Sequence, residues 1–240
     1  MTITEKVIQY QGDGLTMVGT YYADSNASKP RPGILVFPDA RGLDDFTRER
    51  ARRLVEQGYA AMACDFYGNG TLFDTVEAAL SSAYELVGST DKIGARAGAA
   101  MKALSEQKGV DPTKIAALGY CMGGNVAVEL ARTGVDLAAA VAFHGGCVPP
   151  RYQESKRIKA KILVCTGADD PFIPLGMRVA FEEDMRQAGV DFRLHLYGRV
   201  RHSFTVPDID QLGLAASKYE PAADARSWLE MKALFSEVFG

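Results

Sequence analysis

Residues 119–123 have the sequence Gly-Tyr-Cys-Met-Gly, which places a cysteine where the nucleophile motif G-x-S-x-G has its serine. An apolar run at residues 115–118 precedes this motif, and a helix-compatible run at 125–132 follows it. This context predicts a strand, a sharp turn and a helix, with glycines flanking the turn because its backbone is strained. The thiol of Cys121 would then lie at the N-terminal end of a helix. There the helix dipole favours a thiolate, and the free backbone N–H of Met122 can stabilise an oxyanion.

A nucleophilic thiol needs a general base, and the chain has three histidines that could supply it. His202 lies in a turn just past a predicted strand at 192–197, and it is the expected base. His144 follows a predicted strand at 137–143 and is the alternative, either as the base or as a residue that lines a pocket. His195 lies inside a strand, where a packed or surface role is the simplest interpretation.

The acid that orients the base is expected between the nucleophile and the histidine along the chain. Asp169 and Asp170 lie there, directly after a predicted strand at 161–165. A residue before proline has an extended backbone and cannot continue into a helix, which weakly favours Asp170. One of the two carboxylates could instead cap the helix that begins near Pro174, so the residues alone leave this choice open.

The elements that must position these side chains alternate between strand and helix. After an N-terminal antiparallel hairpin that turns at residues 12–14, we expect strands at 34–37, 59–64, 114–118, 137–143, 161–165 and 192–197, and helices at 46–57, 75–87, 92–107, 125–132, 176–187 and 222–239. This alternation predicts an α/β fold with a mostly parallel sheet covered by helices on both faces. Ligands of such sheets bind beyond the carboxyl ends of the strands, where all the candidate residues would meet. The length of 240 residues fits one domain spanning 1–240.

Composition excludes several other classes of protein. The net charge of −3 and the lack of a basic stripe argue against nucleic-acid binding. No apolar run is long enough to span a bilayer, and the N-terminus lacks the apolar core of a signal peptide. Cys64, Cys147 and Cys165 form no C-x-x-C pair with each other or with Cys121, which argues against a disulfide scaffold or a zinc site. We therefore expect a soluble cytoplasmic protein with free thiols that requires no metal or cofactor.

Three segments together resemble the dienelactone hydrolase family of α/β-hydrolases. They are Gly-Tyr-Cys-Met-Gly-Gly at 119–124, Asp-Pro-Phe-Ile-Pro at 170–174 and His-Ser-Phe at 202–204. They occur in the family's order, each after a predicted strand, and the likeness spans nearly the whole chain. The resemblance implies that Cys121 is the nucleophile, His202 the base and Asp170, rather than Asp169, the acid. It also implies that Ala40 supplies a second backbone N–H to the oxyanion.

The chain departs from the family at two places. The family carries an acidic residue, usually glutamate, after the first buried strand, where it touches the resting nucleophile. Here that residue is Asp39, which is shorter and could instead be a turn residue bonded to its own backbone. The arginines that hold the dienelactone carboxylate are also missing. One matching position is Val206, and no arginine occurs between Arg53 and Arg96. Arg41 could substitute for them or could lie in solvent.

Several aromatic residues flank the predicted strand ends and could line an apolar substrate pocket, or could belong to the core; these are Phe66, Tyr67, Tyr120, Phe172 and Phe204.

The sequence thus favours a cysteine-dependent hydrolase. A thiolate would attack a small-molecule ester, lactone or thioester, and water would then cleave an acyl-thioester intermediate. The alternative hypothesis is a non-catalytic α/β-hydrolase-fold protein that binds a ligand or senses oxidants through Cys121. Such a protein would have no need for Asp170 and His202 in addition to the cysteine. Physiological substrate and oligomeric state are not indicated by the sequence.

Overall fold

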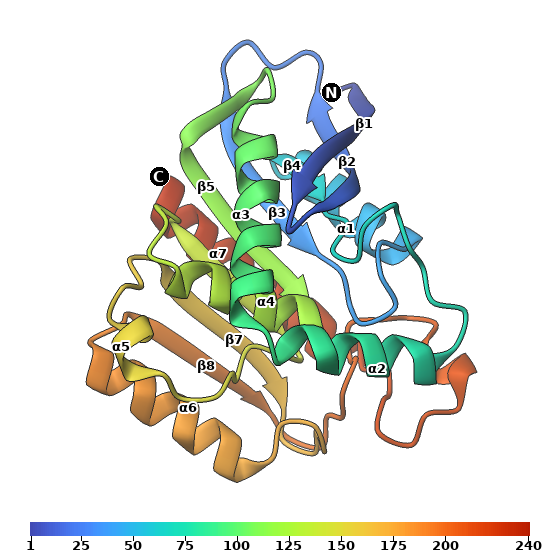
Figure 1. The fold of residues 1–240 in the computed structure, drawn as a ribbon, viewed down its shortest axis with the longest axis vertical. Coiled ribbons are helices and arrows are strands. Elements are labelled where there is room, and N and C mark those ends of the chain that lie inside the picture. The colour runs from blue at the N-terminus through green and yellow to red at the C-terminus, as the bar shows by residue number, and fades with distance from the viewer.

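The computed structural model describes residues 1–240 and contains one eight-stranded sheet in the order β1-β2-β4-β3-β5-β6-β7-β8 (Figure 1). The strands are β1 Ile3–Gly12, β2 Leu15–Asp24, β3 Arg31–Phe37, β4 Ala60–Ala63, β5 Val110–Tyr120, β6 Ala139–Phe143, β7 Lys161–Gly167 and β8 Phe192–Tyr197. The helices are α1 Asp45–Glu56, α2 Val76–Val87, α3 Thr90–Ser105, α4 Met122–Arg132, α5 Tyr152–Ser155, α6 Leu175–Ala188 and α7 Pro221–Phe239, with a 3₁₀ helix, η1, at Ile209–Leu212.

The N-terminal hairpin and the parallel part of the sheet are both as the sequence predicts. Strands β1 and β2 pair antiparallel from Gly12 and Leu15 outward, around a turn in which Asp13 and Gly14 both have positive φ. Such a turn matches the twist of a hairpin. Strand β2 then pairs antiparallel with β4, and every later pairing in the sheet is parallel.

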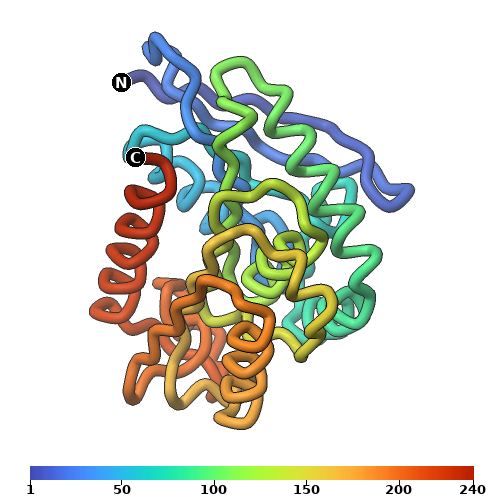
Figure 2. The backbone as a smooth tube through the Cα atoms, turned by 90° about the vertical axis from the view of Figure 1, so that its left-hand side faces the viewer, coloured from blue at the N-terminus to red at the C-terminus, as the bar shows by residue number.

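The central strands are buried on both faces because helices cover both sides of the sheet. In Figure 2, α7 lies on one side and α3 on the other. One core packs α3, α4 and α6 against the sheet, with Phe37 and Phe181 among its fully buried residues. The second packs α1 and α7 against the opposite face, with Leu54 and Phe235 among its members. This arrangement leaves the carboxyl ends of the parallel strands free to carry the loops with the candidate residues.

Several element bounds differ from the sequence prediction. Strand β5 begins at Val110 rather than residue 114, because Val110 and Asp111 pair with the start of β3 before a register shift. Helix α4 begins at Met122, directly after the cysteine, rather than at residue 125. The short helices α5 and η1 were not predicted, because four residues are too few to give a helical period. None of the helices combines the length and the apolarity that crossing a membrane would require.

Candidate active site

Cys121 occupies a strained turn between β5 and α4. Its backbone has φ 54° and ψ −116°, a conformation that costs energy in any residue with a side chain. The flanking glycines are required by close backbone packing. A Cβ on Gly123 would lie 2.4 Å from the carbonyl oxygen of Phe37, and one on Gly119 would lie 2.0 Å from that of Gly123. The turn therefore exposes the thiol at the N-terminus of α4, and the side chain remains partly accessible.

Asp170 and His202 meet at the ends of two neighbouring strands. Asp170 follows β7, and His202 follows β8. The Nδ1 atom of His202 lies 2.7 Å from Asp170 Oδ2. The other carboxylate oxygen accepts the backbone N–H of Phe172 at 2.9 Å, so the acid is fixed at both oxygens. Asp170 is buried, whereas Asp169 is exposed and makes no side-chain hydrogen bond. The structure thus brings Asp170, and not Asp169, to the imidazole.

The His202 ring is electrostatically coupled to both of its neighbours. Burial disfavours its charged form, but Cys121 and the hydrogen-bonded Asp170 outweigh that effect and raise the pKa of His202 to about 10. Since Nδ1 is engaged by the carboxylate, Nε2 is the ring nitrogen left for the thiol and for substrate. Cys121 and His202 line the same cavity. The arrangement places a thiol and a carboxylate-oriented imidazole at one cavity, as a thiolate–imidazolium pair requires.

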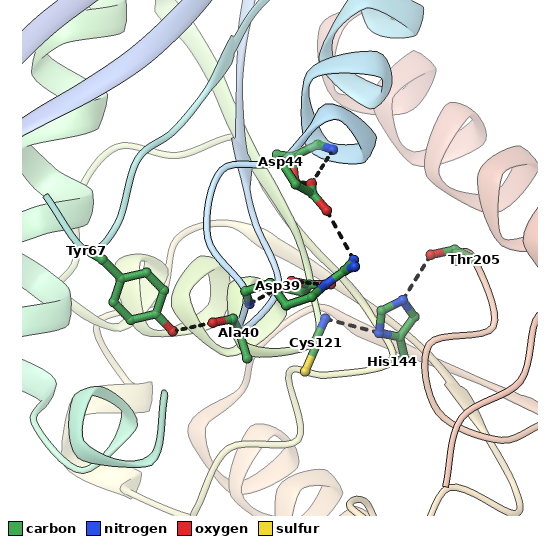
Figure 3. Close-up of polar contacts among 9 residues, drawn as sticks. Asp39, Ala40, Asp44, Tyr67, Cys121, His144 and Thr205 are labelled. Carbon is green, nitrogen blue, oxygen red and sulfur yellow. Dashed lines mark hydrogen bonds and ion pairs between the residues drawn. The ribbon is translucent and has the colours of Figure 1, made fainter. Parts of the chain in front are cut away.

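His144 occupies a different position from the one expected of a base. Its Nδ1 accepts the backbone N–H of Cys121 at 3.1 Å, and its Nε2 lies 2.9 Å from Thr205 Oγ1 (Figure 3). An accepting Nδ1 requires the proton to be on Nε2, which then donates to the threonine. Burial first, and then the charges of His202 and Arg50, hold the pKa of His144 well below its usual range. His144 is therefore a neutral residue that accepts a hydrogen bond from the strained turn, and it also lines the cavity, as the alternative interpretation expected.

His195, in contrast, lies at the edge of the sheet on β8, half-buried, with Nδ1 3.7 Å from Glu230.

An NMR titration of the histidine rings tests this division of roles. We expect the His202 ring to stay protonated through neutral pH and to titrate near pH 10, and His144 to stay neutral as the Nε2–H tautomer. In Cys121→Ala the titration of His202 should move to lower pH, because a main cause of its raised pKa is removed. Asp169→Asn is the matched control and should leave both rings unchanged. A His202 ring that is neutral at pH 7 in the wild type would contradict the ion pair.

The loop after β3 lies beside the thiol and carries three of the predicted residues. Asp39 accepts the backbone N–H of Arg41 at 2.8 Å, and it also accepts the Arg41 guanidinium at 2.9 Å (Figure 3). Its carboxylate makes no hydrogen bond to Cys121. The contacts of Asp39 are thus those of a turn residue bonded to its own backbone, which was the alternative interpretation. Asp39 also lines the cavity. Aspartate is one methylene shorter than glutamate. The Asp39 carboxylate binds Arg41 within the turn and makes no hydrogen bond to the sulfur.

Ala40 is a buried residue, and its backbone N–H has no hydrogen-bond partner in the protein. Met122 is the first residue of α4, so its N–H likewise has no acceptor within the helix. Buried donors without partners are rare and suggest a ligand position.

Tyr67 contacts both of these residues. Its hydroxyl lies 3.0 Å from the carbonyl oxygen of Ala40 (Figure 3) and 3.2 Å from Met122 Sδ. Burial, with the nearby charges of Cys121 and Asp39, raises the pKa of Tyr67, so the hydroxyl keeps its proton. Tyr67 was predicted only as one of several aromatic residues near the strand ends. No sequence signal indicates that its hydroxyl joins two loops.

A cavity of about 400 Å³ opens onto Cys121 and His202. Phe172 lines it and packs edge-on against the His202 ring, with ring centroids 4.9 Å apart. Tyr120 and Phe204 were also expected at the pocket, but neither lines it. Tyr120 is fully buried against Phe46 and Phe143, on the face of the sheet that α1 and α7 cover. Phe204 is buried beneath His144 in the same core.

The remaining cysteines are free thiols like Cys121, and all three are buried. Cys64 directly follows β4 and Cys165 lies in β7; both are core residues, and burial raises the pKa of Cys165 to about 12. Cys147 lines the cavity, and burial also raises its pKa to about 12. No group of three or more His, Cys, Asp or Glu side chains is arranged to hold a metal ion.

The mostly parallel sheet and its two helical layers, with a nucleophile-type turn after β5 and a histidine–aspartate pair after β8 and β7, define an α/β-hydrolase fold. The model of the dienelactone hydrolase family matches residues 18–239, and the chain belongs to that family. The family makes it a hydrolase of the ester and lactone class.

Two relatives illustrate the range of similarity. The crystal structure of a dienelactone hydrolase-like promiscuous phosphotriesterase from metagenomic libraries has 40% sequence identity and a TM-score of 0.95, covering 99% of each chain. Carboxymethylenebutenolidase from Pseudomonas putida is 29% identical over 185 residues, which are 75% of this chain and 78% of the relative.

Proposed function

We propose that this protein hydrolyses carboxylic esters or lactones with Cys121 as nucleophile, His202 as base and acid, and Asp170 as the residue that orients His202. The observation that carries the proposal is the convergence of three loops. A partly exposed thiol on a strained turn faces the same cavity as an imidazole that is held 2.7 Å from a buried carboxylate. A ligand-binding or redox-sensing protein would need only the thiol.

The reaction begins with the thiolate of Cys121, paired with the His202 imidazolium. The sulfur attacks the carbonyl carbon, and the carbonyl π electrons move to the oxygen. The N–H groups of Ala40 and Met122, which have no partner in the protein, are the proposed donors to this oxyanion. When the tetrahedral species collapses, the bond to the leaving oxygen breaks, and His202 Nε2–H protonates that oxygen.

The product of this step is an acyl-thioester on Cys121. Because the thiolate charge is then gone, a main cause of the raised pKa of His202 is removed, and the ring can be neutral. Neutral His202 takes a proton from water, and the resulting hydroxide attacks the thioester carbon. The second tetrahedral species expels the thiolate and releases the acid. The change in ring charge between the two half-reactions lets one histidine act first as acid and then as base.

The proposal is tested by measuring nitrophenol release from para-nitrophenyl butyrate. We expect turnover by the wild type and its loss in both Cys121→Ala and His202→Ala. Turnover that survives either substitution would contradict the proposed triad. Rapid thiol labelling of Cys121 in a wild type that hydrolyses none of a broad panel of esters and lactones would favour the redox-sensing alternative.

Replacing Tyr67 with phenylalanine tests the oxyanion donors. We expect kcat for the butyrate ester to fall roughly 3- to 10-fold with little change in KM, because one neutral hydrogen bond that holds the Ala40 loop is lost. Tyr84→Phe is the matched control, because Tyr84 lines the cavity and its hydroxyl makes no hydrogen bond. A rise in KM at constant kcat would instead assign Tyr67 to ground-state binding.

A second activity is favoured by the 40% identity to a promiscuous phosphotriesterase over nearly the full length of both chains. The same thiolate could attack phosphorus in a neutral phosphotriester, with the same N–H groups facing the phosphoryl oxygen. Diethyl para-nitrophenyl phosphate is a suitable probe. Repeated turnover supports this activity, whereas a single stoichiometric release of nitrophenol with permanent loss of esterase activity would make the compound an inhibitor.

A further inference from the structure

The walls of the catalytic cavity are apolar. One wall is the face of α2 formed by residues spaced at helical intervals, Val76, Ala79, Leu80, Ala83 and Val87. Another part of the lining comes from the segment between β8 and α7, including Ile209, Leu212 and Leu214. Figure 1 places α2 and this segment at the same end of the molecule. The lining includes His202, the neutral His144, Tyr84 and the thiols. Its only other ionisable side chains are Asp39 and Arg41.

The Arg41 guanidinium is already bound by carboxylates of the protein itself. Its Nε lies 3.2 Å from Asp39 Oδ2, and its Nη2 lies 2.9 Å from the same oxygen and 3.1 Å from Asp44 Oδ2. Only Nη1 has no hydrogen-bond partner. Two carboxylates therefore share one guanidinium, and the Asp39–Arg41–Asp44 cluster carries a formal charge of −1. Burial, and then Asp39, raise the pKa of Asp44, as expected where negative charge is in excess.

We infer that the enzyme is selective for uncharged esters with apolar acyl groups and discriminates against substrates that carry a carboxylate. The inference rests on the proposed function. An apolar acyl chain would contact the α2 wall and displace water from it. A carboxylate in the same position would lose its hydration, would find no unpaired cation, and would lie close to a cluster of its own sign. Arg41 thus does not replace the missing carboxylate-binding arginines, because Asp39 and Asp44 already bind it.

The test compares two esters that differ in one terminal group, para-nitrophenyl hexanoate and the mono-para-nitrophenyl ester of adipic acid, at neutral pH. We expect kcat/KM for the hexanoate to be higher by about 100-fold or more, since an unpaired charge entering an apolar site is strongly disfavoured. Equal hydrolysis of both esters would overturn this inference and leave the proposed function intact. Hydrolysis of neither would count against the proposed function itself.

Asp44→Asn tests whether the charge cluster causes the discrimination. Asp44 caps α1 by accepting the N–H of Thr47 at 2.9 Å, and asparagine preserves that cap while it removes one negative charge. We expect the hexanoate-to-adipate ratio of kcat/KM to narrow by about 10-fold, because one charge near the cavity contributes on that scale. Because both esters are measured with the same preparation, this ratio of kcat/KM does not depend on the fraction of the variant that is folded. The matched control Asp45→Asn, at the exposed neighbouring residue, should leave the ratio unchanged. An unchanged ratio in Asp44→Asn would overturn the assignment to this cluster.

Discussion

Replacing Cys121 with alanine is expected to lower kcat/KM for a nitrophenyl ester by about 10⁴-fold or more, because removing the nucleophile of a catalytic triad leaves only oxyanion stabilisation and binding. The fold should be unaffected. Alanine is smaller than cysteine, and the strained φ of 54° is held by backbone packing at Gly119 and Gly123 rather than by the sulfur. The melting temperature should therefore stay close to that of the wild type, which separates lost chemistry from lost structure.

Cys64→Ala is the matched control for this substitution. Cys64 lies in the core, and its thiol hydrogen-bonds only to the carbonyl of Met62 at 3.3 Å. Its replacement should cost some stability through a small cavity and should leave kcat/KM within a few fold of the wild type. If Cys121→Ala keeps more than a small fraction of the activity, another group is the nucleophile.

Asp170→Asn is expected to lower kcat by about 10³- to 10⁴-fold, because an amide no longer fixes the proton of the imidazole on the nitrogen nearest to it. Asp170 is buried, and each of its oxygens accepts a hydrogen bond, one from Phe172 N and one from His202. The substitution also removes a charge that raises the pKa of His202. The imidazolium would therefore be less stable, and the thiolate would lose its counter-ion.

Asp169→Asn distinguishes this mechanism from a general effect of charge. The two aspartates are adjacent, but Asp169 is exposed and its carboxylate makes no hydrogen bond. We expect kcat to change less than two- to three-fold in Asp169→Asn, as is usual for exposed side chains without partners. Steady-state kinetics of both variants on the same ester provide the measurement. Equal losses in the two variants would contradict the specific role of Asp170.

The sequence predicts the class of fold and the residues that meet at the sheet edge because both depend on local patterns. Apolar runs of strand length and helical periods define the alternation of elements, and parallel strands must end at one edge. Short segments such as 119–123 and 170–174 carry their own backbone requirements, namely glycine at close approaches and extended backbone before proline. These requirements hold wherever the segment lies in the fold.

The details of the site that were not predicted depend on contacts between distant segments. Tyr120 precedes the nucleophile, but the pleat of β5 turns its ring to the core face under α1, and the sequence does not specify which face is open. The contact between Tyr67 and Ala40 joins two loops that follow different strands. The pairing of Arg41 with both Asp39 and Asp44 depends on how tightly one loop turns, which composition does not reveal.

The most direct test of the central claim is mass spectrometry of the wild-type enzyme quenched in acid during turnover of para-nitrophenyl butyrate. Acid quenching protonates His202 and so stops hydrolysis of the thioester. The proposed mechanism expects a butyryl group, at most one per chain, on the peptide that contains Cys121, and none on the peptides that contain Cys147 or Ser203. Acylation of a different residue, or sustained turnover with Cys121 unmodified and dispensable, would contradict it.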